Sequence, residues 1–197
     1  MRDGYLVFDL ETKKTFEEVG SRDPSQLGVS VCCLYAYQGD AYSDFLEDDL
    51  GRMQNHFIDA KLLVGFNIRR FDLPVLQPYF SVKIDTFPVF DILEDLTERL
   101  GHRVSLDSVA QATLGANKTG HGLDAIRYFR EGAWEKLKSY CRNDVKLTKD
   151  VFDFGLKNGE VFFTSRDGGK KVRVEVDWID RLPKAAPEAP PAQYKLL

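Results

Sequence analysis

The segment Phe8-Asp9-Leu10-Glu11-Thr12 carries two carboxylates separated by one residue, and it follows a short apolar run. Residues i and i+2 of an extended strand point to the same face, so Asp9 and Glu11 are expected to lie side by side at the strand's end. Two like charges held together are costly unless a cation lies between them, and oxygen-only ligands favour Mg²⁺ or Mn²⁺. The alternative is a pair of exposed acids where a strand ends.

A second polar pair, Asn67 and Asp72, follows the apolar run at 62–65. This run predicts a buried strand, and the loop after it would bring both side chains to the strand's end. Because a proline stands two residues after Asp72, this residue is also predicted to be the N-cap of a short helix, and Asp91 is predicted to be the N-cap of the helix expected to begin there. The capping role does not exclude a second role in binding a metal or a substrate.

A third pair, Tyr140 and Asp144, is spaced four residues apart within a helical pattern over 133–157. Residues i and i+4 of a helix share one face, one turn apart. An aspartate on the side of the helix that carries the apolar residues requires a cation partner. The alternative is a surface aspartate beside a half-buried tyrosine.

The elements that must position these residues follow from the apolar periodicity. Strands come first and helices later, which indicates an α/β domain with a mixed sheet. Strands or extended segments are expected at 5–8, 27–37, 41–45, 62–65 and 84–90, and helices at 46–60, 72–79, 91–100, 105–114, 122–130 and 133–157. The runs 161–164 and 172–178 predict a hairpin. We therefore expect a domain over 1–158, a C-terminal β-hairpin extension over 159–182, and a Pro/Ala-rich disordered tail over 183–197.

Composition sets further limits. Hydrophobic residues make up 43% of the 197 residues and charged residues 29%, which is typical of a globular protein. No apolar run approaches the roughly 20 residues that cross a bilayer, so no membrane partner is expected. A signal peptide is not expected either, and the three cysteines lack metal-ligand spacing. We interpret Cys32, Cys33 and Cys141 as reduced, mostly buried thiols and predict a cytoplasmic protein.

The charge is distributed unevenly along the chain. The net charge is −4, yet acids outnumber bases over 1–98 and bases outnumber acids over 99–149. Such asymmetry permits an acidic site in one half and a phosphate-contacting surface in the other.

Taken together, D-x-E on a first strand, N-x-x-x-F-D after an apolar strand and Y-x-x-x-D on a late helix resemble the DEDD 3′–5′ exonucleases. The tyrosine is similar to that of the DEDDy branch. The first motif is close to that of the proofreading domain of B-family DNA polymerases. The segment 105–118 resembles one that these domains and stand-alone or helicase-associated RNase H-like nuclease domains carry before the last motif. The resemblance implies an RNase H-like fold, a mixed central β-sheet with strand 1 in the middle and helices on both sides.

The resemblance also implies roles for the motif residues. Asp9, Glu11 and Asp144 would hold one Mg²⁺ or Mn²⁺ ion, and Asp9 and Asp72 would hold a second, about 3.5–4 Å away. Tyr140 would orient the attacking water, since an unperturbed tyrosine with a pKa near 10 is a poor base at neutral pH. The terminal nucleotide would be contacted by some of Leu10, Thr12, Phe66, Asn67 and Arg69.

The implied substrate is the 3′ end of single-stranded nucleic acid, with DNA slightly favoured over RNA. The implied products are nucleoside 5′-monophosphates. Two alternatives stay open: a nucleic-acid-binding module that serves a helicase or polymerase partner with weak nuclease activity, and a structure-specific endonuclease. The terminal segment 193–197, a glutamine followed by apolar residues, loosely resembles peptides that bind a bacterial sliding clamp.

Overall fold

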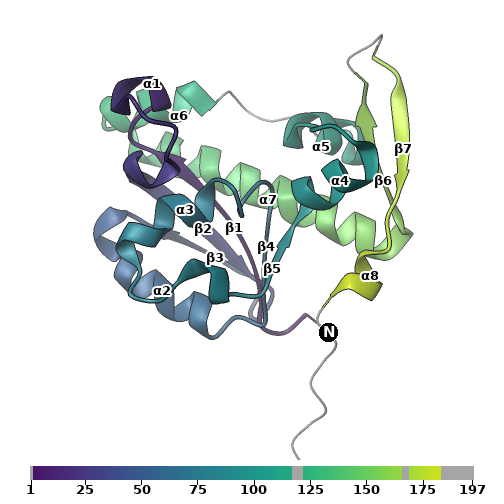
Figure 1. Ribbon diagram of the computed structural model, residues 1–197, viewed down its shortest axis with the longest axis horizontal. Helices are drawn as coiled ribbons and strands as arrows, with labels where there is room; N and C mark the ends of the chain where they lie inside the picture. Colours follow the sequence, from purple (N-terminus) through teal and green to yellow (C-terminus); the bar gives the residue numbers. More distant parts are fainter. Residues whose placement is uncertain (1, 117–121, 166–168, 183–197) are drawn as a thin grey trace, which may run out of the picture.

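The computed structural model describes residues 2–116, 122–165 and 169–182. Its centre is a five-stranded mixed sheet in the order β3-β2-β1-β4-β5 (Figure 1). β1 pairs antiparallel with β2 and parallel with β4, so it lies in the middle of the sheet, as the resemblance to the DEDD exonucleases implies. The strands are β1 (Tyr5–Thr12), β2 (Val29–Ala36), β3 (Ala41–Phe45), β4 (Leu62–Gly65) and β5 (Val89–Asp91).

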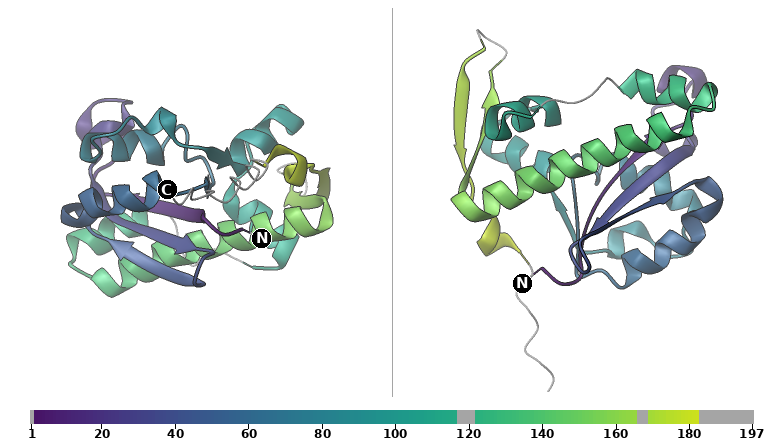
Figure 2. Two further views of the ribbon diagram at one scale, coloured as in Figure 1. Left: turned by 90° about the horizontal axis from the view of Figure 1, so that it is seen from below. Right: turned by 180° about the vertical axis from the view of Figure 1, so that it is seen from behind.

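Helices cover both faces of this sheet (Figure 2). The longest, α7, crosses one face together with α4, α5 and α6, while α2 and α3 pack on the other. The helices are α1 (Phe16–Val19), α2 (Leu50–Ile58), α3 (Asp72–Leu76), α4 (Ile92–Leu100), α5 (Leu106–Leu114), α6 (Gly122–Arg130), α7 (Trp134–Asn158) and α8 (Trp178–Arg181). Short 3₁₀ turns lie at Pro24–Gln26, Glu47–Asp49, Gln77–Tyr79 and Ile84–Thr86.

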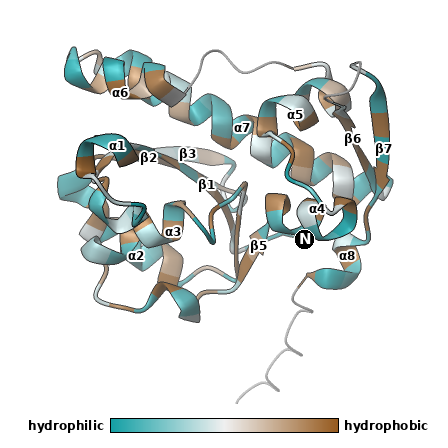
Figure 3. Ribbon diagram, turned by 45° about the horizontal axis from the view of Figure 1, so that its top comes forward, coloured by the Kyte–Doolittle hydropathy of each residue, from teal (hydrophilic) through white to brown (hydrophobic). Residues whose placement is uncertain are grey.

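The alternation of side chains along β1 divides the apolar residues into two cores. Tyr5 and Val7 pack beneath α7, whereas Leu6, Phe8 and Leu10 pack beneath α2 and α3. In Figure 3 hydrophilic and hydrophobic residues alternate along the helices, as expected for helices that cover a sheet on one side. Because side chains alternate between the two faces along β1, the next odd-numbered residues, Asp9 and Glu11, also point toward α7.

Several predicted boundaries need correction. β1 does not end at Asp9 but continues to Thr12, because its polar half keeps pairing with β2, where Asp9 lies opposite Cys33. The helix expected at 46–60 divides into a 3₁₀ turn and the shorter α2. The segment 84–90, expected to be extended, begins with a 3₁₀ turn at Ile84–Thr86.

The C-terminal hairpin consists of β6 (Glu160–Thr164) and β7 (Lys171–Glu175), and it forms a separate two-stranded sheet. The edge of β6 that faces α5 is capped by two hydroxyls. Ser108 Oγ bonds the N–H and C=O of Thr164, and Thr113 Oγ1 does the same for Phe162. The chain then turns into α8 where the sequence predicts strand through residue 178.

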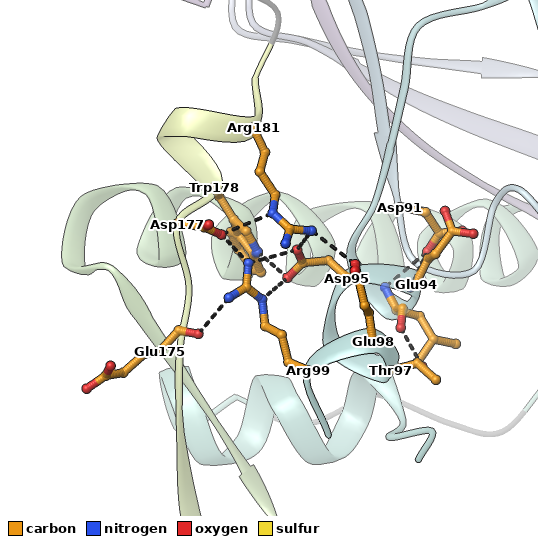
Figure 4. A network of polar contacts seen from close by, with 11 residues as sticks. Asp91, Glu94, Asp95, Thr97, Glu98, Arg99, Glu175, Asp177, Trp178 and Arg181 are labelled. Atoms are coloured by element: carbon orange, nitrogen blue, oxygen red, sulfur yellow. Dashed lines mark hydrogen bonds and ion pairs between the residues drawn. The ribbon is translucent and has the colours of Figure 1, made fainter. Parts of the chain in front are cut away.

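Trp178 anchors this C-terminal part to the main domain. Its ring is 1% exposed, it packs on Phe90 and Phe152, and its indole N–H donates to the Asp95 carboxylate at 2.7 Å. Arg99 and Arg181 bond the same carboxylate, which joins α4 to α8 (Figure 4).

Three further predictions concern the cysteines, membrane-spanning helices and the C-terminal tail. The three cysteines are free and buried, as predicted. Within the described ranges, no helix combines the length and the apolar character that crossing a bilayer requires. The predicted tail at 183–197, including the segment that resembles a clamp-binding peptide, lies outside the described residues.

Candidate active site

Three carboxylates converge at the carboxyl end of β1. Ligand oxygens of Asp9, Glu11 and Asp144 all lie within 4.8 Å of one another. β1 presents the first two on the face that α7 covers, and α7 supplies the third from its middle. The two carboxylates that were predicted to lie side by side on β1 and the aspartate that was predicted on the apolar side of the helix therefore lie close together.

The chemistry of this cluster fits a divalent cation. All three donors are carboxylate oxygens, which hard cations such as Mg²⁺ and Mn²⁺ prefer. Asp144 is 3% exposed, and Asp9 and Glu11 are half-buried. Bringing like charges together away from bulk water is unfavourable, and a bound cation would relieve it.

Asp72 lies beside the cluster but is held by a different contact. It is 3% exposed, and its Oδ1 accepts a hydrogen bond of 3.2 Å from the backbone N–H of Leu10, the residue between Asp9 and Glu11. The prediction that Asp72 is a helix N-cap is wrong, because Phe71 occupies that position and Asp72 lies in the first turn of α3. Its carboxylate instead fastens α3 to β1.

Tyr140 lies one helical turn before Asp144 and is 4% exposed. Burial raises the pKa of its hydroxyl well above the ordinary value, and the negative charges of Asp144, Glu11 and Asp9 raise it further. A phenol in this setting stays protonated, so it can donate a hydrogen bond into the acidic site.

The loop after β4 is shaped by a buried carboxylate from β5. Asn67 adopts a left-handed conformation with φ 72°, which is uncommon outside glycine. Asp91 holds it there by accepting hydrogen bonds from the backbone N–H groups of Asn67 at 2.8 Å and Arg69 at 3.0 Å. Asp91 also caps α4, as predicted, by accepting from Leu93 and Glu94.

The residues predicted to contact a terminal nucleotide are not all in one place. Leu10 is buried in the core on the opposite face, and the Thr12 hydroxyl donates to the carbonyl of Lys14. Phe66 is partly buried and packs against the core that lies between the sheet and α7. The Arg69 guanidinium donates to the carbonyl of Val89 and pairs with Glu94, so it is directed toward β5.

Two contributions to this region were not predicted. The first is the hydrogen bond from the Asn67 N–H to Asp91, which joins residues 24 positions apart. The sequence around Asp91 indicates only that this residue caps α4. The side-chain oxygen of Asn67 also accepts a hydrogen bond of 2.8 Å from Arg103. The excess of bases over 99–149 hints at such a residue without selecting it.

Comparison with known families agrees with this geometry. A model of the RNase_H superfamily matches residues 6–154, which include the three clustered carboxylates, Asp72 and Tyr140. The chain belongs to the RNase_H superfamily. No curated protein matches it. Membership of the RNase_H superfamily indicates nuclease-type activity, a nucleic-acid-cleaving hydrolase, and nucleases of this kind generally use divalent metals.

Proposed function

We propose that the protein is a metal-dependent 3′–5′ exonuclease that removes nucleoside 5′-monophosphates from single-stranded nucleic acid, with DNA favoured over RNA. The observation that carries this proposal is the convergence of Asp9, Glu11 and Asp144 within 4.8 Å, with Tyr140 one turn away. These residues stand in the motif order of the DEDDy exonucleases, which the sequence resembles.

The carboxylates are the groups that would hold the metal. Asp9, Glu11 and Asp144 would hold one Mg²⁺ or Mn²⁺ ion, and Asp72 with Asp9 a second. Two such ions lower the pKa of an attacking water and stabilise the leaving oxygen of a phosphodiester. Asp72 would serve this purpose from a fixed place, because the N–H of Leu10 holds one of its oxygens beside β1.

The remaining residues would position the reactants. The protonated Tyr140 hydroxyl would orient the attacking water by hydrogen bonding, not by removing its proton. Asn67 and Phe66 would face the terminal nucleotide from the loop after β4, whereas the buried side chains of Leu10 and Thr12 would not contact it. Because Arg69 is engaged by Glu94 and Val89, it would need a new rotamer to reach the same nucleotide. A helicase or polymerase partner, clamp binding through 193–197 and a cytoplasmic location stay predictions.

A pair of matched substrates tests the reaction. We would compare a linear single-stranded DNA with a circular one of the same sequence, with Mg²⁺, Mn²⁺ or EDTA. Metal-dependent release of nucleoside 5′-monophosphates from the linear strand, with the circle intact, is the expected result. Opening of the circle would replace the proposal by an endonuclease. Binding of both strands with no cleavage would replace it by a nucleic-acid-binding module.

A further inference from the structure

A pocket of about 290 Å³ lies at the end of β5, apart from the carboxylate cluster. Asn67 and Arg70 line it from the loop after β4, Glu94 and Glu98 line it from α4, and Arg103 lines it from the connection that follows α4. Two guanidiniums and several carboxylates therefore share one small space. Which of these groups are free to bind a ligand depends on which of them already have partners elsewhere.

The acidic side chains of the pocket are already engaged. Asp91, at its base, accepts backbone hydrogen bonds through both carboxylate oxygens. Glu94 pairs with Arg69 at 3.0 Å. Glu98 pairs with Arg181 at 3.1 Å, on the side of α4 that faces α8 (Figure 4). Neither of these two arginines lines the pocket.

The two basic side chains of the pocket are in the opposite situation. Arg70 and Arg103 are exposed, and neither forms an ion pair within the part of the chain that the structure describes. Arg103 donates one hydrogen bond of 2.8 Å to Asn67, which leaves most of its N–H donors available. These two side chains therefore offer N–H donors in the fork geometry that suits a phosphate.

The position of the pocket relates it to the cluster. β1, β4 and β5 are adjacent and parallel, and neighbouring strands lie about 4.8 Å apart. Asp91, the last residue of β5, pairs with Gly65, which is one residue beyond the Val64 that pairs with Val7. The end of β5 is therefore roughly 10 Å from the part of β1 where Asp9 begins the acidic segment. Arg103 also lines a second pocket, with Ser108 and Thr164, so this edge continues toward the C-terminal hairpin.

We infer that Arg103 and Arg70 bind a backbone phosphate of the substrate strand, one or two nucleotides from the cleaved bond. The inference rests on the proposed function, since it assumes that a strand end enters the carboxylate cluster. Asn67 then has two roles, because it faces the terminal nucleotide and holds the Arg103 guanidinium in place. The strand runs from the cluster across the end of β5 and toward the hairpin.

Equilibrium binding of a 5′-fluorescein-labelled single-stranded DNA in EDTA, over a series of salt concentrations, tests this site. Each phosphate contact with a single strand contributes about 0.7 to the slope of log affinity against log salt. Arg103→Ala is expected to lower that slope by about 0.7 and the affinity about tenfold. Arg52→Ala is the matched control, since Arg52 is an exposed arginine of α2 on the opposite face, and it should bind as wild type.

Neutral methylphosphonate linkages locate the contact. One such linkage is placed in turn at each of the last positions before the 3′ end. The modification should weaken binding by the wild type at one position, and binding by Arg103→Ala should not change at that position. If Arg103→Ala binds with the wild-type slope, or stays sensitive at every linkage, the inference is overturned even where the protein degrades DNA. If the protein binds through Arg103 but cleaves nothing, the proposed reaction fails while this phosphate site stands.

Discussion

The Asp72 carboxylate accepts a hydrogen bond of 3.2 Å from the backbone N–H of Leu10, at the point of β1 that lies between Asp9 and Glu11. Both groups are buried. One oxygen of Asp72 is therefore committed to fastening α3 to the central strand, and the same bond places its carboxylate beside the cluster. Asp72 therefore has a structural role through this bond, which is distinct from its proposed role in holding a metal ion.

Two substitutions at Asp72 should distinguish its structural role from its role in cleavage. Asp72→Asn retains a carbonyl oxygen that can accept from Leu10, so the free energy of unfolding should change little. Asp72→Ala leaves a buried N–H without its partner and should lower that free energy by about 1–3 kcal/mol. Both variants should lose metal-dependent cleavage. Urea denaturation in EDTA measures the difference, and equal stability of the two variants would show that the bond contributes nothing.

Metal binding should stabilise the fold, because a ligand that binds the native state alone raises the melting temperature. We expect Mn²⁺ or Mg²⁺ to raise the melting temperature of the wild type, and Asp144→Asn to abolish the rise. Asp150→Asn is the matched control on the same helix, since Asp150 pairs with Lys146 and Lys149. An equal rise for Asp144→Asn and wild type would contradict the assignment of the site.

The parts of this site that follow from local periodicity were predictable. The period of two along β1 places Asp9 beside Glu11, and the helical spacing places Tyr140 one turn from Asp144. The end of β1 was predicted too early because polar residues in a strand that lines a site look like a strand exit. Only the pairing of that polar half with β2 shows that the strand continues.

The partners of isolated acids could not be predicted in the same way. Asp72 and Asp91 both stand at helix starts, and the sequence predicts capping for each. Asp91 does cap α4, whereas Asp72 bonds a strand 62 positions away. A cap is a local interaction with a sequence signature, but a bond to a distant backbone N–H depends on how the chain folds back.

Tyr140→Phe should reduce kcat roughly ten- to hundredfold while KM and the melting temperature change little. The ring still fills its buried site, and only the hydroxyl that would orient the water is lost. Steady-state kinetics on a short oligonucleotide provides the measurement, and thermal melting controls for the fold. Wild-type kcat in this variant would exclude the hydroxyl from the reaction.

Gly155→Ala should detach the C-terminal anchor. A Cβ at Gly155 would lie 2.2 Å from the Trp178 ring, which is buried and cannot move aside cheaply. We expect a loss of about 1–3 kcal/mol in the free energy of unfolding, with a red shift of tryptophan emission. Gly51→Ala is the control, because nothing lies within 4 Å of its Cβ in α2 and it should stabilise slightly. If both variants are equally stable, the packing of Trp178 on α7 does not hold the hairpin.

The most direct test of the central claim is the digestion of a 5′-labelled single-stranded oligonucleotide by the wild type, Asp144→Asn and Asp150→Asn, each with Mg²⁺, Mn²⁺ or EDTA. We predict a ladder that shortens from the 3′ end with metal for the wild type and Asp150→Asn. Asp144→Asn should be slower by a hundredfold or more, on the order of the several kcal/mol that a metal site contributes. An intact oligonucleotide in every lane, or an equal ladder from Asp144→Asn, would contradict the claim that these carboxylates form the active site of an exonuclease.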